Sequence, residues 1–198
     1  MTRTKHDLRS EATRRRLVSA ARTLFGARGY ADVGTEEIVR AAGVTRGALY
    51  HQFRDKADLF AAVAEEIEAE IAEQIAGAAG TEADPVGALR SGARLFLDAC
   101  AEPEVERIIL LDAPAVLGWE AWRDLAGRYG LGLVQFGLRA AMEAGAIVPL
   151  PVAPLAHVLI GALNESALYV ARAEDRPAAR EQCVAILDRI LRGLRTGG

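Results

Sequence analysis

The stretch from Thr35 to Phe60, TEEIVRAAGVTRGALYHQFRDKADLF, constrains the fold of this chain more than any other. It predicts two short helices joined by a tight turn, with a third helix following at once. Thr35 is a good N-cap residue, and Glu36 and Glu37 follow it where the helix dipole favours negative charge. Gly43 is expected to end the first helix, because positive φ is easy for glycine and costly for most other residues. A helix pair across such a turn can place its second helix in the major groove of DNA.

The second helix of the pair is expected to begin with Thr45 as its cap and to extend to Phe53, with Leu49 and Phe53 on its apolar side. Its other side carries groups suited to DNA. An arginine at the N-terminus of such a helix can pair with guanine through two hydrogen bonds, and tyrosine, histidine and lysine can donate to phosphates. A glycine lets the backbone come close to the duplex. The residues expected to contact DNA are Thr35, Thr45, Arg46, Gly47, Tyr50, His51 and Lys56.

Each of these side chains also has a purely structural interpretation. Arg46 and His51 could be solvated surface groups, and Tyr50 could be a core aromatic. Their convergence on one face of one short helix favours the DNA-binding interpretation.

The same stretch closely resembles the DNA-binding signature of TetR-family transcriptional regulators. The resemblance rests on the capped first helix, on Ala42-Gly43-Val44, on the helix from Thr45 to Phe53 with its Leu-Tyr-His-Gln-Phe run, and on Lys56 and Leu59-Phe60. It covers roughly the first third of the chain, whereas the remainder resembles the family only in length and helical pattern. The resemblance implies a homodimer that binds a palindromic operator, most often as a repressor released by a small-molecule effector. A few such proteins activate transcription instead.

Composition predicts an all-α fold of about nine helices. Hydrophobic residues make up 51% of the chain, whereas clusters of strand-favouring residues are few. Outside the helix pair, helices are expected over residues 9–28, 56–76, 85–101, 104–111, 119–144, 153–173 and 177–195, after a loosely ordered basic arm over residues 1–8. Four glycines at 127, 130, 132 and 137 leave three possibilities open for their helix: close packing, room for a ligand, or a break.

Charge divides the chain into two parts. Residues 1–56 hold 12 Lys and Arg against 6 Asp and Glu, and the remainder holds 12 against 21, although the net charge of the whole is only −3. A basic first part beside an acidic second part is expected when one small domain meets phosphate. We therefore expect a DNA-binding domain over residues 1–56, a linking helix over residues 56–76, and an effector-binding and dimerisation domain over residues 77–198.

The last two predicted helices, residues 153–173 and 177–195, carry more apolar positions than one buried face requires. One side of the pair is expected to pack on its own domain and the other on a second copy, giving a two-fold interface.

Candidates for an effector pocket are the rare polar or aromatic groups that interrupt apolar helices. Core packing is an alternative for each, and His157 and Asn164 could equally lie at the dimer interface. These candidates are Phe96, Arg107, Asp112, Trp119, Trp122, Arg123, Tyr129, Phe136, His157, Asn164 and Tyr169. A mostly apolar small molecule would suit this set.

Other functional classes find little support. Cys100 and Cys183 are too far apart for a metal site or a disulfide framework, the three histidines are scattered, and no common catalytic motif is present. No cofactor, no metal and no enzymatic activity are therefore expected. The polar start of the chain and the lack of a long apolar run favour a cytoplasmic protein. A dimeric helical interaction protein without DNA binding stays as the alternative.

Overall fold

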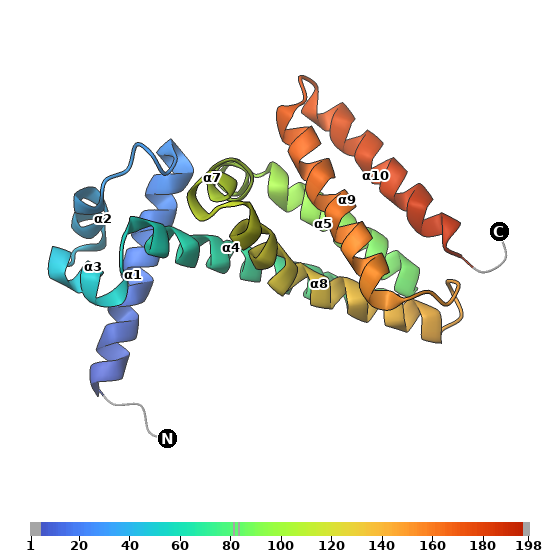
Figure 1. The fold of residues 1–198 in the computed structure, drawn as a ribbon, viewed down its shortest axis with the longest axis horizontal. Helices are drawn as coiled ribbons and strands as arrows, with labels where there is room; N and C mark the ends of the chain where they lie inside the picture. Colours follow the sequence, from blue (N-terminus) through green and yellow to red (C-terminus); the bar gives the residue numbers. More distant parts are fainter. Residues whose placement is uncertain (1–4, 81, 83, 196–198) are drawn as a thin grey trace. The chain divides into compact units, whose positions relative to one another are not determined.

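The computed structural model describes residues 5–80, 82 and 84–195, and the prediction of an all-α fold is confirmed (Figure 1). The only β contact among these residues is an isolated antiparallel bridge between Ile147 and Arg195. The helices are α1 (Lys5–Arg28), α2 (Thr35–Ala42), α3 (Arg46–Gln52), α4 (Lys56–Ala79), α5 (Pro85–Ala101), α6 (Pro103–Val105), the π-helix η1 (Glu106–Asp112), α7 (Ala113–Leu117), α8 (Trp119–Glu143), α9 (Val152–Arg172) and α10 (Arg176–Gly193). Because α6, η1 and α7 follow one another without a break, they make one helical stretch.

The chain divides into two compact units. Unit 1 comprises Met1–Ile67 and Pro103–Trp122, and unit 2 comprises Glu68–Glu102 and Arg123–Gly198. The sequence did not predict that residues 103–122 pack with the N-terminal helices. The functional boundary expected at residue 77 is a separate matter and stays a prediction.

Unit 1 is built around the start of α4 and the end of α1. Phe25 and Phe60 are fully buried, and their rings lie 5.4 Å apart between centroids. Tyr30 completes the cluster, at 5.6 Å from Phe25 and 5.2 Å from Phe60. These aromatic contacts, together with buried Leu17 and Ile38, hold α1, α2 and α4 together.

Unit 2 packs α5, α9 and α10 side by side, as Figure 1 shows. A core cluster joins these helices to α8 through buried aliphatic side chains from each of them and from Ile147 in the α8–α9 connection; the helical members include Val86, Leu138, Ala156, Leu159 and Leu191. Helix α8 is continuous, and close packing explains two of its glycines. A Cβ at Gly137 would lie 2.7 Å from Leu89 Cδ2, and one at Gly130 would lie 3.1 Å from Ile160 Cδ1.

Several predicted helix ends were wrong, and among them the linking helix α4 continues to Ala79 instead of ending at residue 76. Helix α1 begins at Lys5, so residues 5–8 of the expected arm are helical, and residues 1–4 lie outside the described residues. The N-cap of α2 is Gly34, and Thr35 is the first helical residue. The helix expected to end at residue 111 continues past Pro114 into α7, because the preceding turn is a π-helix in which the Ala113 N–H donates to the Ile108 carbonyl. We infer that this wider turn accommodates the proline ring.

Candidate nucleic-acid interface and internal cavity

The turn between α2 and α3 has the geometry that the sequence predicts. Gly43 adopts φ +61°, its N–H donates to Arg40 O at 3.1 Å, and the Val44 N–H donates to Val39 O at 3.0 Å. From α1, Arg16 Nη2 donates to Gly43 O at 2.9 Å. The turn is therefore closed by its own backbone and tied to α1.

Helix α3 begins as expected, because the Thr45 hydroxyl accepts the Ala48 N–H at 3.2 Å. Leu49 and Phe53 are buried beneath the helix, although Phe53 lies just after its last residue rather than within it. The Arg14 guanidinium from α1 lies 4.5 Å from the centre of the Phe53 ring. The apolar side of α3 is thus fixed on α1, and its other side is left to solvent.

The exposed side of α3 brings five of the seven predicted DNA-contacting residues together: Thr45, Arg46, Gly47, Tyr50 and His51. The Arg46 side chain is 64% exposed, pairs with Glu36 at 3.3 Å, and lies 5.6 Å from the centre of the Tyr50 ring. An ion pair this exposed contributes about 0–1 kcal/mol, so a base edge or phosphate can replace it. A Cβ at Gly47 would meet only Thr45 Oγ1, at 3.9 Å, so the space beside Gly47 is open. Thr35 is half-buried at the start of α2.

Lys56 lies in a different environment from the other predicted contacts. Its ammonium donates to Tyr30 O at 2.9 Å and to Val33 O at 3.0 Å, and it lies 3.9 Å from the centre of the Tyr30 ring. These contacts hold the loop before α2 in place. A phosphate contact from Lys56 stays a prediction, but its observed role is internal.

Residues 103–122 support the same loop. The Tyr30 N–H donates to Asp112 Oδ2 at 2.7 Å, and the Arg107 side chain packs beside Gly29. Arg22 of α1 pairs with Glu104 at 2.9 Å. The sequence offered Arg107 and Asp112 as pocket residues, whereas the structure places them against the loop that leads into α2.

A cavity of about 410 Å³ lies within unit 2. Its lining is mostly aliphatic and aromatic and comes from the second half of α4 and from α5, α8 and α9. The main contributors are Ile71, Ile75, Leu89, Phe96, Tyr129, Leu133, Phe136, Ile160, Leu163 and Asn164. Its size and apolar character suit a small organic molecule.

Four of the eleven predicted pocket residues line this cavity: Phe96, Tyr129, Phe136 and Asn164. Of the others, Trp119 and Trp122 form an aromatic pair in unit 1, with ring centroids 4.9 Å apart. The remaining three, Arg123, His157 and Tyr169, have exposed side chains in unit 2. Sequence alone could not separate these groups, because each is a polar or aromatic interruption of an apolar helix.

Glu68 is a cavity residue that sequence reasoning missed. Its side chain is only 5% exposed, and burial in apolar surroundings raises the pKa of its carboxyl from the ordinary 4.5 to about 7. A sequence signal was present: Glu68 lies four residues after Ala64 and three before Ile71, on the buried side of α4. This signal was overlooked because several other glutamates of α4 are exposed.

Comparison with known proteins settles the family. A family model described as "Tetracyclin repressor-like, C-terminal domain" matches residues 86–194, more than half of the chain, and one described as "Bacterial regulatory proteins, tetR family" matches residues 17–63. The chain belongs to the TetR family of transcriptional regulators. The second match covers the turn at Gly43 and all of α3, so the resemblance seen in the sequence is confirmed.

Individual relatives agree with this assignment. A TetR-family transcriptional regulator from Pectobacterium atrosepticum is 36% identical, with a TM-score of 0.85 over 98% of each chain. The regulator AcrR of Shigella flexneri is 34% identical over 102 residues, which are 51% of this chain and 47% of AcrR. The chain thus matches between a quarter and about half of the length of curated relatives such as AcrR, SrpR and TtgR. RolR, solved with the ligand resorcinol, shares the fold at 20% identity, with a TM-score of 0.75 over 96% of each chain.

The described residues lack two kinds of feature. No helix there has the length and apolar character needed to cross a membrane. No group of three or more His, Cys, Asp or Glu side chains in the described part of the chain is arranged to hold a metal ion.

Proposed function

We propose that this TetR-family protein is a cytoplasmic repressor that binds a palindromic operator as a homodimer. The observation that carries the proposal is the exposed row of Arg46, Tyr50 and His51 on α3, held by the Gly43 turn and the Arg16 contact. The helix is short and fixed along its buried side, so it can enter a major groove without rearrangement. Arg46 would read a base edge, and Tyr50 and His51 would donate to phosphates.

Dimerisation would use α9 and α10. Their outer sides carry large apolar residues that are exposed in the single chain: Val158 at 66%, Tyr169 at 55%, Ile186 at 60% and Ile190 at 43%. Exposed apolar residues gathered on two adjacent helices are typical of a protein interface. Two-fold pairing would let the α3 helices of two copies enter successive major grooves, about 34 to 36 Å apart.

The cavity of unit 2 would hold the effector. An apolar molecule that favours a dimer with another spacing between its α3 helices would weaken operator binding, typically by a coupling free energy of about 1 to 3 kcal/mol. RolR, which shares this fold, was solved in complex with the ligand resorcinol, a small aromatic molecule. The mostly aliphatic and aromatic lining of the cavity supports an apolar effector here.

A titration of the purified dimer against a duplex from the DNA just upstream of its own gene tests the proposal. We expect tight binding that exceeds binding to random duplex and weakens steeply between two salt concentrations, because phosphate contacts release counterions. A random-sequence selection covers the case in which the operator lies elsewhere. Absence of any preferred sequence in that selection would contradict the proposal and favour a helical interaction protein.

A further inference from the structure

The cavity of unit 2 contains one buried carboxyl group in an otherwise mostly apolar lining. Glu68, on α4, lines the cavity and is 5% exposed. Among the described residues, no hydrogen bond or ion pair is made to its carboxyl group. An isolated buried charge is strongly disfavoured, so a group that satisfies this carboxylate would be bound preferentially.

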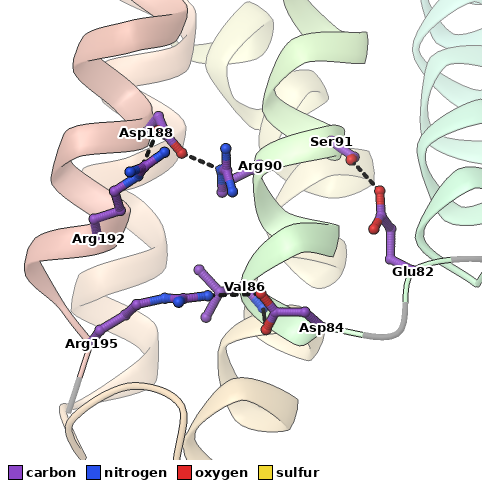
Figure 2. Close-up of polar contacts among 8 residues, drawn as sticks. All are labelled: Glu82, Asp84, Val86, Arg90, Ser91, Asp188, Arg192 and Arg195. Carbon is purple, nitrogen blue, oxygen red and sulfur yellow. Dashed lines mark hydrogen bonds and ion pairs between the residues drawn. The ribbon is translucent and has the colours of Figure 1, made fainter. Parts of the chain in front are cut away.

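No other charged group inside the cavity can serve that purpose. No lysine or arginine lines it, and its other acidic residue, Glu82, is exposed and accepts a hydrogen bond from Ser91 Oγ at 2.6 Å (Figure 2). Cys100 of α5 is buried, and burial together with the Glu68 charge raises the pKa of its thiol, so it stays neutral. The cavity therefore carries a negative charge whenever Glu68 is ionised.

The remaining lining would favour a cation beside Glu68. Phe96 and Tyr129 line the same cavity, as does Phe136 at its exposed edge, and the faces of aromatic rings attract cations. The Asn164 side-chain oxygen is a further acceptor within the lining. The aliphatic majority of the lining requires that the rest of the ligand be apolar.

We infer that the cavity binds an apolar molecule that carries a single cationic amine, and that the ammonium pairs with the Glu68 carboxylate. The inference rests on the proposed function, because it names the chemical class of the effector. A neutral apolar molecule would leave the carboxyl unpaired, and an anionic one would be repelled by it. Binding of the amine would also release to solvent any proton that Glu68 carries.

The test compares three probes with the same apolar body: phenylhexylamine, phenylhexanol and phenylhexanoate. Calorimetric titration at pH 8 should give the order amine, alcohol, carboxylate from tightest to weakest. Glu68→Gln should lower the affinity for the amine about tenfold or more and change that for the alcohol less than about threefold. Glu73→Gln, which alters an exposed carboxylate on the same helix, is the matched control and should change neither.

Proton linkage gives a second readout. From pH 6 to pH 8 the wild-type affinity for the amine should rise, whereas Glu68→Gln should abolish that rise. Glu82 and Tyr129, which line the cavity, and the buried Cys100, whose thiol senses the Glu68 charge, remain in the variant, so they serve as internal controls.

The outcomes separate this inference from the proposed function. The inference is overturned if the alcohol binds as tightly as the amine, if Glu68→Gln weakens the binding of both equally, or if none of the probes binds. Operator binding is tested separately by the DNA titration. If the amine binds through Glu68 but the protein selects no DNA sequence, the inference holds and the regulator proposal fails.

Discussion

At the scale of single residues, exposure separates two cations that look equivalent in the sequence. Arg46 is 64% exposed, and its one ion pair is weak, so its guanidinium is available to a partner. Lys56 is half-buried, with its ammonium directed at the carbonyls of Tyr30 and Val33. Both were predicted to contact DNA. The exposed Arg46 is placed to contact the base edges of DNA, whereas Lys56 is placed to support the loop that leads into α2.

Arg46→Ala should relax the sequence preference at one base pair of each half-site, at a cost of about 1 to 3 kcal/mol in specific binding. The physical reason is loss of a guanidinium that can make two hydrogen bonds to guanine. Competition binding with duplexes substituted at single positions measures this. An equal loss for specific and random duplexes would instead assign Arg46 to phosphate contact alone.

Glu68→Gln should stabilise the protein in a pH-dependent way. The folded-state pKa of about 7 lies above the ordinary 4.5, so the folded protein holds the proton more tightly than the unfolded chain between those values. The wild type therefore has the full contribution of this group below pH 4.5 and loses it as the pH rises to 7. At pH 8 the variant should have the greater free energy of unfolding, by up to roughly 3 kcal/mol.

Urea denaturation of wild type and Glu68→Gln at pH 5 and pH 8 measures this difference. Glu73→Gln should show no comparable change with pH, since its carboxylate is exposed. A stability gain for Glu68→Gln that is the same at both pH values would show that the Glu68 pKa is not raised by folding.

At the scale of elements, the α2–α3 turn depends on one backbone conformation. A side chain at Gly43 would be strained at φ +61°, and its Cβ would lie 2.7 Å from Arg16 Nη2. The same Arg16 group makes the hydrogen bond that ties the turn to α1. A substitution here would disturb the backbone and the tie together.

Gly43→Ala should therefore lower the free energy of unfolding by about 1 to 2 kcal/mol and weaken operator binding, because αL conformation is costly for alanine. Gly132→Ala is the matched control. Gly132 lies within α8 with open space around it, so the same change there should be stabilising by about 0.5 to 1 kcal/mol. Chemical denaturation of both variants measures the contrast, and equal effects would contradict this account of the turn.

Helix α10 and the residues just after it are joined to α5 and its N-cap by two ion-pair groups of unequal burial (Figure 2). In the first, the Asp188 side chain is only 15% exposed and pairs with Arg90 and, at 2.8 Å, with Arg192. In the second, Arg195 pairs with Asp84 at 2.7 Å, and both side chains are nearly half exposed. Asp84 also caps α5 by accepting the Val86 N–H at 3.1 Å.

Asp188→Asn should cost about 1 to 3 kcal/mol of stability, because it leaves the partly buried Arg90 without its carboxylate. Arg195→Ala should cost less than about 1 kcal/mol, since its pair is exposed and the Asp84 cap survives. Thermal or urea unfolding of the two variants gives the comparison. If Arg195→Ala lowered the free energy of unfolding more than Asp188→Asn, the Arg195–Asp84 pair would be the stronger contact, contrary to this prediction.

At the scale of the whole molecule, charge and exposed apolar surface point to different partners for the two parts of the chain. The first 56 residues have twice as many basic as acidic residues, and α3 there presents Arg46, Tyr50 and His51. The acidic remainder instead exposes apolar residues on α9 and α10. The first pattern suits DNA, and the second suits another copy of the same chain.

Ile186→Glu should shift the protein from dimer to monomer, because the proposed interface would have to bury a charge against an apolar surface. Light scattering coupled to gel filtration measures the mass. Leu111→Glu places the same charge on an exposed apolar residue of unit 1, 47% exposed, and should leave the dimer intact. If the Ile186→Glu variant still forms a dimer, the dimer interface does not lie on this face of α9 and α10.

The sequence by itself determined the features that depend on local chemistry. Positive φ at Gly43, the Thr45 cap and the buried Leu49 each follow from a few neighbouring residues, and all are confirmed. Helical periodicity likewise predicted the all-α fold, because an apolar stripe is a property of one helix alone. The suggested pocket residues are a weaker case: four of the eleven line the cavity, but the other seven interrupt apolar helices in the same way, so the local pattern did not distinguish them.

Only the tertiary structure decided which distant residues meet. The placement of residues 103–122 in unit 1, the carbonyl contacts of Lys56 and the isolation of Glu68 in the cavity all depend on neighbours far away in the chain. Burial and charge pairing are properties of assembled helices, so no local pattern fixes them. From the sequence, a glutamate on an amphipathic helix is expected to be exposed to solvent. Whether it is buried depends on how the neighbouring helices pack around it.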